Sequence, residues 1–348
     1  MDDEDTQYDA ELVRFVFDLG KMDPLRMLVR AQAHIEQSLR HFIVAAAPSP
    51  QNVGLQRLDF DGTVRLALIL GLNAEVKPAL KALGVLQGTF ARSIDAEFGS
   101  QEADNFYNVL SPAMKQVLRE VYQEFRVEQN LGEFKRQPPA RRLVWFLIGI
   151  WSAILAERKH GPIPNENAGV LPPGYIGELE SRRVSFIRLL DDADDLQLVI
   201  RGHSYLDVEL REFIFAVAPQ PRAVRNSNFD YAGALGLAMT LGLDPSLAAG
   251  LTAVGALRNK FAHSVDMELT GHEAKKIYEK LDTSVRTGAQ QAWATTHQKY
   301  PDNGRAESLL EAAPRDLLAT SMSMLFLGIM LGQLKHRRGL IEWRRDST

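Results

Sequence analysis

The sequence repeats itself at a spacing of 171 residues. At this shift Phe15 falls on Phe186, and residues 39–43 (LRHFI) fall on residues 210–214 (LREFI). The register then continues without a gap for about a hundred residues, which is the signature of a duplicated structural unit. Further identical pairs are Ala47-Pro48 and Ala218-Pro219, Asp59 and Asp230, Leu70-Gly71-Leu72 and Leu241-Gly242-Leu243, Phe90-Ala91 and Phe261-Ala262, and Tyr107 and Tyr278. The repeat predicts two copies of one domain.

The segment between the copies is rich in residues that end helices. Gly161-Pro162-Ile163-Pro164 is followed by Pro172-Pro173-Gly174, and proline cannot continue a helix because it lacks a backbone N–H and clashes with the preceding turn. We therefore expect a degenerate helical domain over residues 1–160, a linker over residues 161–175, and a second helical domain over residues 176–348. A chain of 348 residues is also longer than one hydrophobic core usually supports.

Helix signals occur in both copies. Asp244 before Pro245 is typical of a helix N-cap followed by proline at the first helical position, and Thr270 with Glu273 forms a capping-box pattern. No stretch shows a convincing alternation of apolar and polar residues, so the fold is predicted to be all-α. Two copies of a surface that pairs with itself can do so within one chain, which predicts helical bundles arranged as an internal pseudo-dimer.

The apolar runs over residues 143–156 and 317–334 are interpreted as buried core helices. A membrane span needs about 20 mostly apolar residues; the first run is shorter, and the second contains polar residues such as Ser321 and Gln333. The absence of cysteine excludes disulfides and Cys-ligated metals. The acidic N-terminus lacks the basic and apolar regions of a secretory signal. We therefore expect a cytoplasmic protein without a membrane partner.

One helix end differs between the copies. Residues 257–264 read LRNKFAHS, whereas the equivalent residues 86–93 read LQGTFARS. The apolar and small positions are shared, but the first copy has Gln, Gly and Arg where the second has Arg258, Asn259 and His263. Packing is therefore expected to be common to both copies, and any chemistry at this helix end to belong to the second copy.

Two interpretations of Arg258, Asn259 and His263 remain open. Asn259 and His263, four residues apart, share a helix face that Arg258 can reach. His263 can accept a proton, Arg258 can hold a phosphate, and Asn259 can orient either, so the three suffice for metal-independent RNA cleavage. Alternatively, Arg258 and Asn259 bind a neighbouring acid and His263 ends the helix near the negative end of its dipole. Exposure in a cleft favours catalysis, whereas burial with an acidic partner favours the structural role.

The second copy resembles the mannitol operon repressor (MtlR-like) family. The resemblance rests on residues 201–207 (RGHSYLD), on Leu241-Gly242-Leu243 and on the Arg-Asn-x-x-Ala-His end from Arg258 to His263, and it covers most of residues 196–281. It implies an all-α protein of the transcriptional repression class that acts through protein partners. The residues agree with this, because the chain shows no helix-turn-helix signature and has a net charge of −4, which gives no general attraction to nucleic acid.

The same helix end is similar to the motif of HEPN-domain ribonucleases and toxins, which pair two such motifs across a dimer cleft. For this protein, such a pairing requires two chains to associate through their second halves, because only the second half carries the motif. The leading prediction is a cytoplasmic regulatory protein that binds another protein through helical surfaces, with homo-oligomerisation left open. The alternative is a HEPN-type metal-independent ribonuclease that uses Arg258, Asn259 and His263 on RNA.

No cofactor or metal is predicted. The eight histidines include His34, His41, His203 and His272, none of which has a second ligand at metal-binding spacing on one helix. The acidic run over residues 191–195 is interpreted as a solvated turn, since it lacks the glycine and spaced ligands of a calcium loop. The basic residues 335–338 are typical of a helix C-terminus.

Overall fold

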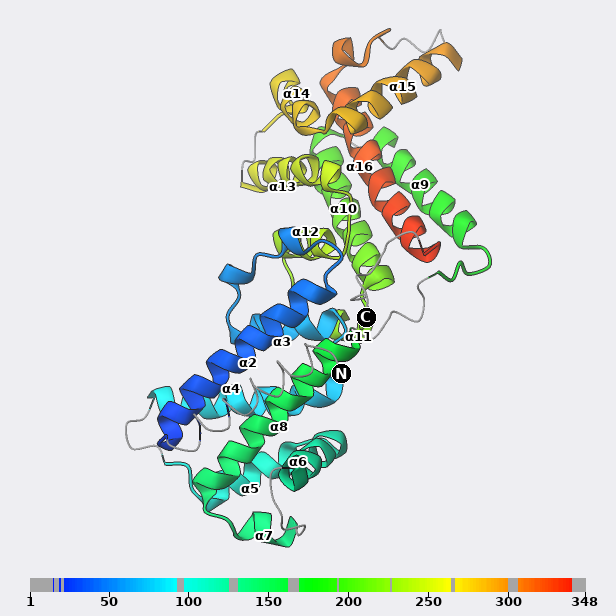
Figure 1. Ribbon diagram of the computed structural model, residues 1–348. Helices are drawn as coiled ribbons and strands as arrows, with labels where there is room; N and C mark the ends of the chain where they lie inside the picture. Colours follow the sequence, from blue (N-terminus) through cyan, green and yellow to red (C-terminus); the bar gives the residue numbers. More distant parts are fainter. Residues whose placement is uncertain are drawn as a thin grey trace. The chain divides into compact units, whose positions relative to one another are not determined.

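The computed structural model of the chain describes residues 15, 19, 22–92, 97–124, 131–161, 169–192, 194–225, 227–263, 267–299 and 306–339. All regular secondary structure in these residues is helical, which confirms the all-α prediction for this part of the chain. The contacts divide it into two compact units (Figure 1). Unit 1 contains the described residues up to 47 and from 54 to 161, and unit 2 contains residues 48–53 and those from 169 onward.

Unit 1 is built around two long helices, α2 and α8, that pack along one another. The buried core between the helices of this unit is rich in aromatic rings; the rings of Phe106 and Phe146 are stacked with centroids 4.8 Å apart. Its helices are α2 (Pro24–Ala46), α3 (Phe60–Ile69), α4 (Lys77–Arg92), α5 (Ser100–Val109), α6 (Pro112–Glu124), α7 (Leu131–Arg136) and α8 (Pro139–His160), with short 3-10 turns η2 (Leu55–Arg57) and η3 (Ala74–Val76).

Unit 2 is built around α10 and α16, which pack in the same way. The rings of Phe186 and Phe326 stack in its core at 4.3 Å. Its helices are α9 (Tyr175–Asp192), α10 (Asp195–Val217), α11 (Pro221–Arg225), α12 (Tyr231–Thr240), α13 (Ala248–His263), α14 (Gly271–Lys280), α15 (Thr283–Lys299) and α16 (Pro314–Arg337), with 3-10 turns η1 (Pro50–Asn52), η4 (Pro245–Leu247) and η5 (Leu309–Glu311). The early turn η1 belongs here because the Ser49 N–H donates to the Thr240 carbonyl at 3.3 Å.

Both capping signals read from the sequence mark helix starts. The Asp244 carboxylate accepts from the Ser246 N–H at 3.0 Å and opens η4, which leads into α13. The Thr270 hydroxyl accepts from the Glu273 N–H at 3.3 Å and opens α14. The Glu273 carboxylate binds Lys260 at 3.3 Å, so it joins α14 to α13.

Four helices of unit 1 have counterparts in unit 2 with the same length and a spacing of 171 residues. The pairs are α2 and α10, α3 and α12, α4 and α13, and α5 and α14. Within each unit these helices also pack on one another in the same combinations. The structure therefore places equivalent stretches of sequence in equivalent helices.

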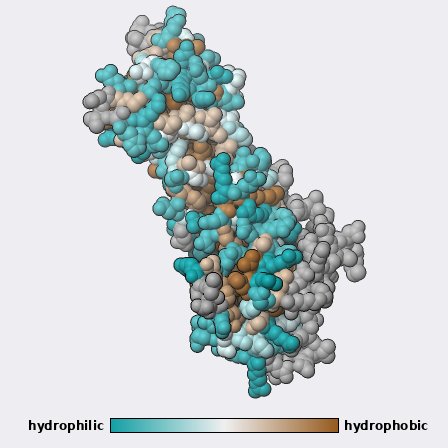
Figure 2. All heavy atoms as spheres, turned by 90° about the vertical axis from the view of Figure 1, so that its left-hand side faces the viewer, coloured by the Kyte–Doolittle hydropathy of each residue, from teal (hydrophilic) through white to brown (hydrophobic). Residues whose placement is uncertain are grey.

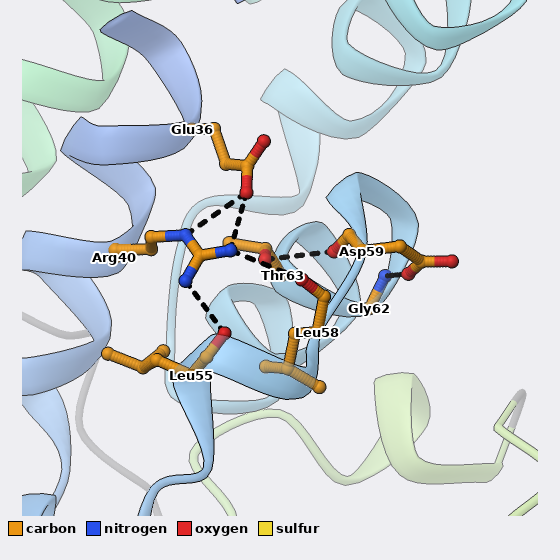
Figure 3. Close-up of polar contacts among 7 residues, drawn as sticks. All are labelled: Glu36, Arg40, Leu55, Leu58, Asp59, Gly62 and Thr63. Atoms are coloured by element: carbon orange, nitrogen blue, oxygen red, sulfur yellow. Dashed lines mark hydrogen bonds and ion pairs between the residues drawn. The ribbon is translucent and has the colours of Figure 1, made fainter. Parts of the chain in front are cut away.

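An arginine fastens the segment before α3 to α2 (Figure 3). The Arg40 guanidinium is bonded to the carboxylate of Glu36 and to the backbone carbonyls of Leu55 and Leu58, at 2.6, 2.7 and 3.1 Å. In unit 2, Arg211 donates to Asp207 at 3.1 Å and to the Phe229 carbonyl at 2.9 Å. Three of these positions recur at the 171-residue spacing, so the units share this polar fastening as well as their helices.

Helices α8 and α16 are long and apolar enough to cross a membrane by length and composition. In this structure each lies in the core of its own unit, with 61% and 56% of its most apolar window buried. Each also carries polar groups into that core. Buried Arg142 of α8 binds Asp104 at 2.7 Å, and buried Gln333 of α16 binds Glu209 at 2.6 Å. Both runs thus contribute to a core in this structure, but α8 extends well beyond residues 143–156, so the argument from the short length of that run was wrong.

Candidate functional site

The three residues singled out at the end of α13 are accessible, and two of them contact each other. Asn259 and His263 are exposed, and Arg258 is partly exposed. The Arg258 guanidinium donates to the Asn259 side-chain oxygen at 3.2 Å. His263 is the last residue of the helix and makes no side-chain hydrogen bond within the described part of the chain. The structure therefore brings Arg258 and Asn259 together and leaves His263 one turn away.

Arg258 faces a buried histidine instead of an acid. Among the described residues, no carboxylate lies within ion-pair distance of its guanidinium. Its positive charge acts on His203, which is only 9% exposed, and burial followed by this charge lowers the pKa of His203 below its ordinary value of 6.5. The acidic partner expected for a purely structural Arg258 is thus not found in this part of the chain.

His203 belongs to a polar cluster that α10, α12 and α13 build together. Its ring lies against the ring of Tyr231, with centroids 4.3 Å apart. The Tyr231 hydroxyl donates to the Leu251 carbonyl at 3.0 Å, and burial raises the pKa of this hydroxyl. A Cβ on Gly255 would meet the Tyr231 ring at 2.9 Å, so the close approach of α13 to this ring needs glycine. Asp207, four residues after His203, exerts the opposing charge effect on the histidine.

The sequence alone did not identify this cluster. His203 and Asp207 lie in the segment that carries the family resemblance, but no pattern in the sequence indicates a role for Tyr231. The available signal was the His-x-x-x-Asp spacing, which places both side chains on one face of a helix. The contact with Tyr231 depends on the packing of α12 and has no local signal.

Unit 1 has a different set of side chains at the equivalent positions. The positions of His203, Asp207, Tyr231 and Arg258 are occupied by Gln32, Glu36, Phe60 and Gln87. The imidazole, the phenol hydroxyl and the guanidinium are all missing there, although the surrounding helices are retained. The polar cluster is therefore specific to unit 2.

A groove lies beside this cluster, between α13 and α14. Its volume is about 370 Å³. Of the motif residues 257–264, only Leu257 and Lys260 line it. The lining residues are Ala249, Thr252, Ala253, Ala256, Leu257, Lys260, His272, Glu273, Lys276, Ile277 and Lys280. Arg258, Asn259 and His263 thus lie outside the groove, and none of them is held in a cleft by it.

Unit 1 has a groove between the equivalent helices, α4 and α5, with a volume of about 600 Å³. Each of its ten lining residues lies 171 positions before a lining residue of the α13–α14 groove. These residues are Pro78, Lys81, Ala82, Val85, Leu86, Thr89, Glu102, Asn105, Phe106 and Val109. The same positions therefore form a groove in both units.

The two grooves differ in chemistry. Val85 and Val109 leave 60% and 49% of their surface exposed on the α4–α5 groove, whereas the position of Val109 is a lysine, Lys280, in the α13–α14 groove. Figure 2 shows hydrophobic groups, in brown, lying open among hydrophilic ones on one face of the molecule. The unit 2 groove, with three lysines in its lining against one in the unit 1 groove, is thus the more basic.

The remaining candidates from the sequence are a metal site, the acidic run over residues 191–195 and the basic run over residues 335–338. Among the described residues, no group of three or more His, Asp or Glu side chains is arranged to hold a metal ion. Within the acidic run, Asp194 caps α10 by accepting from the Gln197 N–H at 2.7 Å. Within the basic run, His336 is buried, and burial lowers its pKa to about 4, while Arg337 lies over the Tyr175 ring at 5.5 Å. The basic run is therefore not a uniformly exposed patch.

Comparison with family models, with curated proteins and with solved structures gave no match for this chain.

Proposed function

We propose that the chain is a regulatory protein of the MtlR-like type that acts by binding another protein through its helical surfaces. The observation that carries this proposal is the pair of grooves built from equivalent positions in the two units. A groove between two helices with an apolar floor is a common receptor for an amphipathic helix. Exposed apolar side chains such as Val85 and Val109 are typical of surfaces that contact a partner.

The same geometry supports a tandem duplication, and we infer that the two units are copies of one ancestral domain. Matching helix ends, the Arg40 and Arg211 fastenings and the two grooves all favour this. In a pseudo-twofold arrangement, the distance from one position in the first copy to another position in the second copy equals the distance measured after the two copies are exchanged. The chain contains no cysteine, so spin labels can be placed at 41 with 252, and at 81 with 212, without background labelling. Equal distances in the two double mutants support the pseudo-dimer, and unequal ones contradict it.

Photo-crosslinking in the native cell tests the binding proposal. A benzoylphenylalanine at Ala256 lies in the α13–α14 groove, whereas Ala262 is an exposed alanine on the same helix outside it. We expect one protein to crosslink from position 256 and not from position 262. Equal crosslinking from both positions, or from neither, would argue against a groove-binding regulator.

The second candidate is a HEPN-type ribonuclease, with the cytoplasm as its location in either case. It is favoured by one observation, namely that Arg258 lacks an acidic partner among the described residues while Asn259 and His263 are exposed. The roles are those of a base for His263, a phosphate ligand for Arg258 and an orienting amide for Asn259. Cleavage of a mixed RNA pool in chelator, lost in folded His263→Ala and Arg258→Ala variants, would establish this function in place of the first.

A further inference from the structure

The rim of the α13–α14 groove carries three lysines above an apolar floor. Leu257 and Ile277 are buried at the floor. Lys260, Lys276 and Lys280 are exposed at the rim. A ligand that fills this groove therefore meets hydrophobic contacts at its centre and positive charge at its edge.

The three lysines differ in their ion-pair partners. Lys260 binds Glu273 at 3.3 Å, but neither Lys276 nor Lys280 forms an ion pair with a described residue. They are four residues apart on α14, a spacing at which like charges repel. The helix dipole favours a cation in the last turn, which accounts for Lys280 but not for Lys276, one turn earlier. The groove lining therefore carries three lysines and one glutamate, an excess of positive charge that suits a negatively charged ligand.

We propose that the α13–α14 groove binds an amphipathic helix of a partner protein, with apolar side chains in the groove and acidic side chains against Lys276 and Lys280. This inference rests on the proposed function and names the chemistry of the partner. Charge complementarity selects the acidic helix, since exposed charges at the edge of an interface mainly set specificity and association rate. Single-stranded RNA is less suited, because it is held by aromatic stacking as well as by charge, and no Phe, Tyr or Trp is among the described residues that line the groove.

The α4–α5 groove provides an internal control. The positions of Lys276 and Lys280 are occupied there by Asn105 and Val109, and the position of Lys260 by Thr89. The remaining charged side chains at its lining are one lysine and one glutamate, Lys81 and Glu102. This groove has the floor without the positive rim, so an acidic helix should bind to unit 2 alone.

A displayed library of 16-residue helical peptides, selected on the full-length protein, tests the chemistry directly. The selection uses wild type as bait and removes peptides that also bind the Lys276→Glu, Lys280→Glu double variant. We expect the enriched peptides to carry apolar residues at helical spacing and a net negative charge. Enrichment without an acidic bias, or no enrichment, would overturn the inference.

Binding of the most enriched peptide is then measured by fluorescence anisotropy. The double variant Lys276→Glu, Lys280→Glu should weaken binding by about tenfold or more, and binding should weaken as salt rises from 0.05 to about 0.5 M. Lys275→Glu is the matched control, because Lys275 is an exposed lysine of the same helix that does not line the groove. An equal loss in the control would overturn the inference, and so would a short RNA that binds more tightly with the same lysine dependence.

Failure here is distinguishable from failure of the proposed function. If the crosslink from position 256 captures a partner whose binding is insensitive to Lys276→Glu and Lys280→Glu, the regulatory role stands. The inference that the partner presents an acidic helix is then wrong. If no partner crosslinks and RNA is cleaved, the regulatory role itself fails.

Discussion

Where α13 packs Gly255 against the ring of Tyr231, α4 packs Gly84 against the ring of Phe60. A Cβ at Gly255 would lie 2.9 Å from the ring, whereas one at Gly84 would lie at an ordinary 3.7 Å. Both units thus have a glycine next to an aromatic ring at this position, but the glycine lies closer to the ring in unit 2. The hydroxyl of Tyr231, bonded to the Leu251 carbonyl, accompanies the tighter packing in unit 2.

The comparison separates two kinds of position. Positions that build the helices and their apolar contacts are retained between the units, because changing the volume of a packed core is costly. Positions that carry charge or a polar group at the surface differ freely, as at Lys276 and Asn105. Differences between the units therefore indicate where a function specific to unit 2 can lie.

The largest expected effect is at a buried carboxylate found only in unit 2. Glu209 is 2% exposed and binds Arg182 at 3.3 Å and Gln333. Glu209→Ala should destabilise unit 2 by about 4 kcal/mol, because it leaves buried polar partners unpaired. The equivalent residue in unit 1 is Ser38, bonded by Trp151, and Ser38→Ala should cost only about 1 kcal/mol. Hydrogen exchange resolved by peptide measures each unit; equal costs would contradict the comparison.

Acid should weaken unit 2 more than unit 1. An unfolded histidine takes up a proton near pH 6.5, but buried His336 does so only near pH 4. Between these values the unfolded state binds more protons, so stability falls as the pH falls, by roughly 3 kcal/mol in all. Hydrogen exchange of α16 measured from pH 7 to pH 4 reports this loss.

The control for the acid experiment is His336→Leu, which should reduce the pH dependence of unit 2 without abolishing it, because burial also lowers the pKa of His203. His34 and His41, the two histidines of α2, are not buried, so α2 should change much less over the same range. A slope in unit 2 that is undiminished in His336→Leu would assign the effect to other groups.

Adding a methyl group to the two equivalent glycines should have opposite outcomes. Gly255→Ala should destabilise unit 2 by about 2 kcal/mol, because its Cβ overlaps the Tyr231 ring. Gly84→Ala has room and replaces glycine inside a helix, so it should be neutral or stabilise by up to about 1 kcal/mol. Urea unfolding of the two variants measures the difference; the same sign in both would show that the packing does not differ as described.

The smallest difference is expected at the shared arginine fastening. Arg40→Ala and Arg211→Ala should each cost about 1 to 2 kcal/mol, since each loses hydrogen bonds to a carboxylate and a backbone carbonyl. Unfolding midpoints of the two variants should therefore fall by similar amounts. A cost confined to one unit would show that this fastening is not equivalent in the two.

Local features of the fold were predictable from the sequence, whereas the site was predictable only in part. Asp244 and Thr270 marked helix starts because capping is a contact between near neighbours. The sequence also indicated the end of α13, but it left open whether Asn259 and His263 are exposed. The His203–Tyr231 contact, the buried state of His336 inside a basic run and the α13–α14 groove could not, because each depends on which helices meet in three dimensions.

Transferring the positive rim from unit 2 to unit 1 tests the central claim most directly. The variant Asn105→Lys, Val109→Lys gives the α4–α5 groove the two lysines of its counterpart. The stoichiometry of acidic-helix binding, measured by titration calorimetry, should rise from one peptide per chain to two. A stoichiometry that stays at one would contradict the claim that the units share a groove and differ in the charge that selects its ligand.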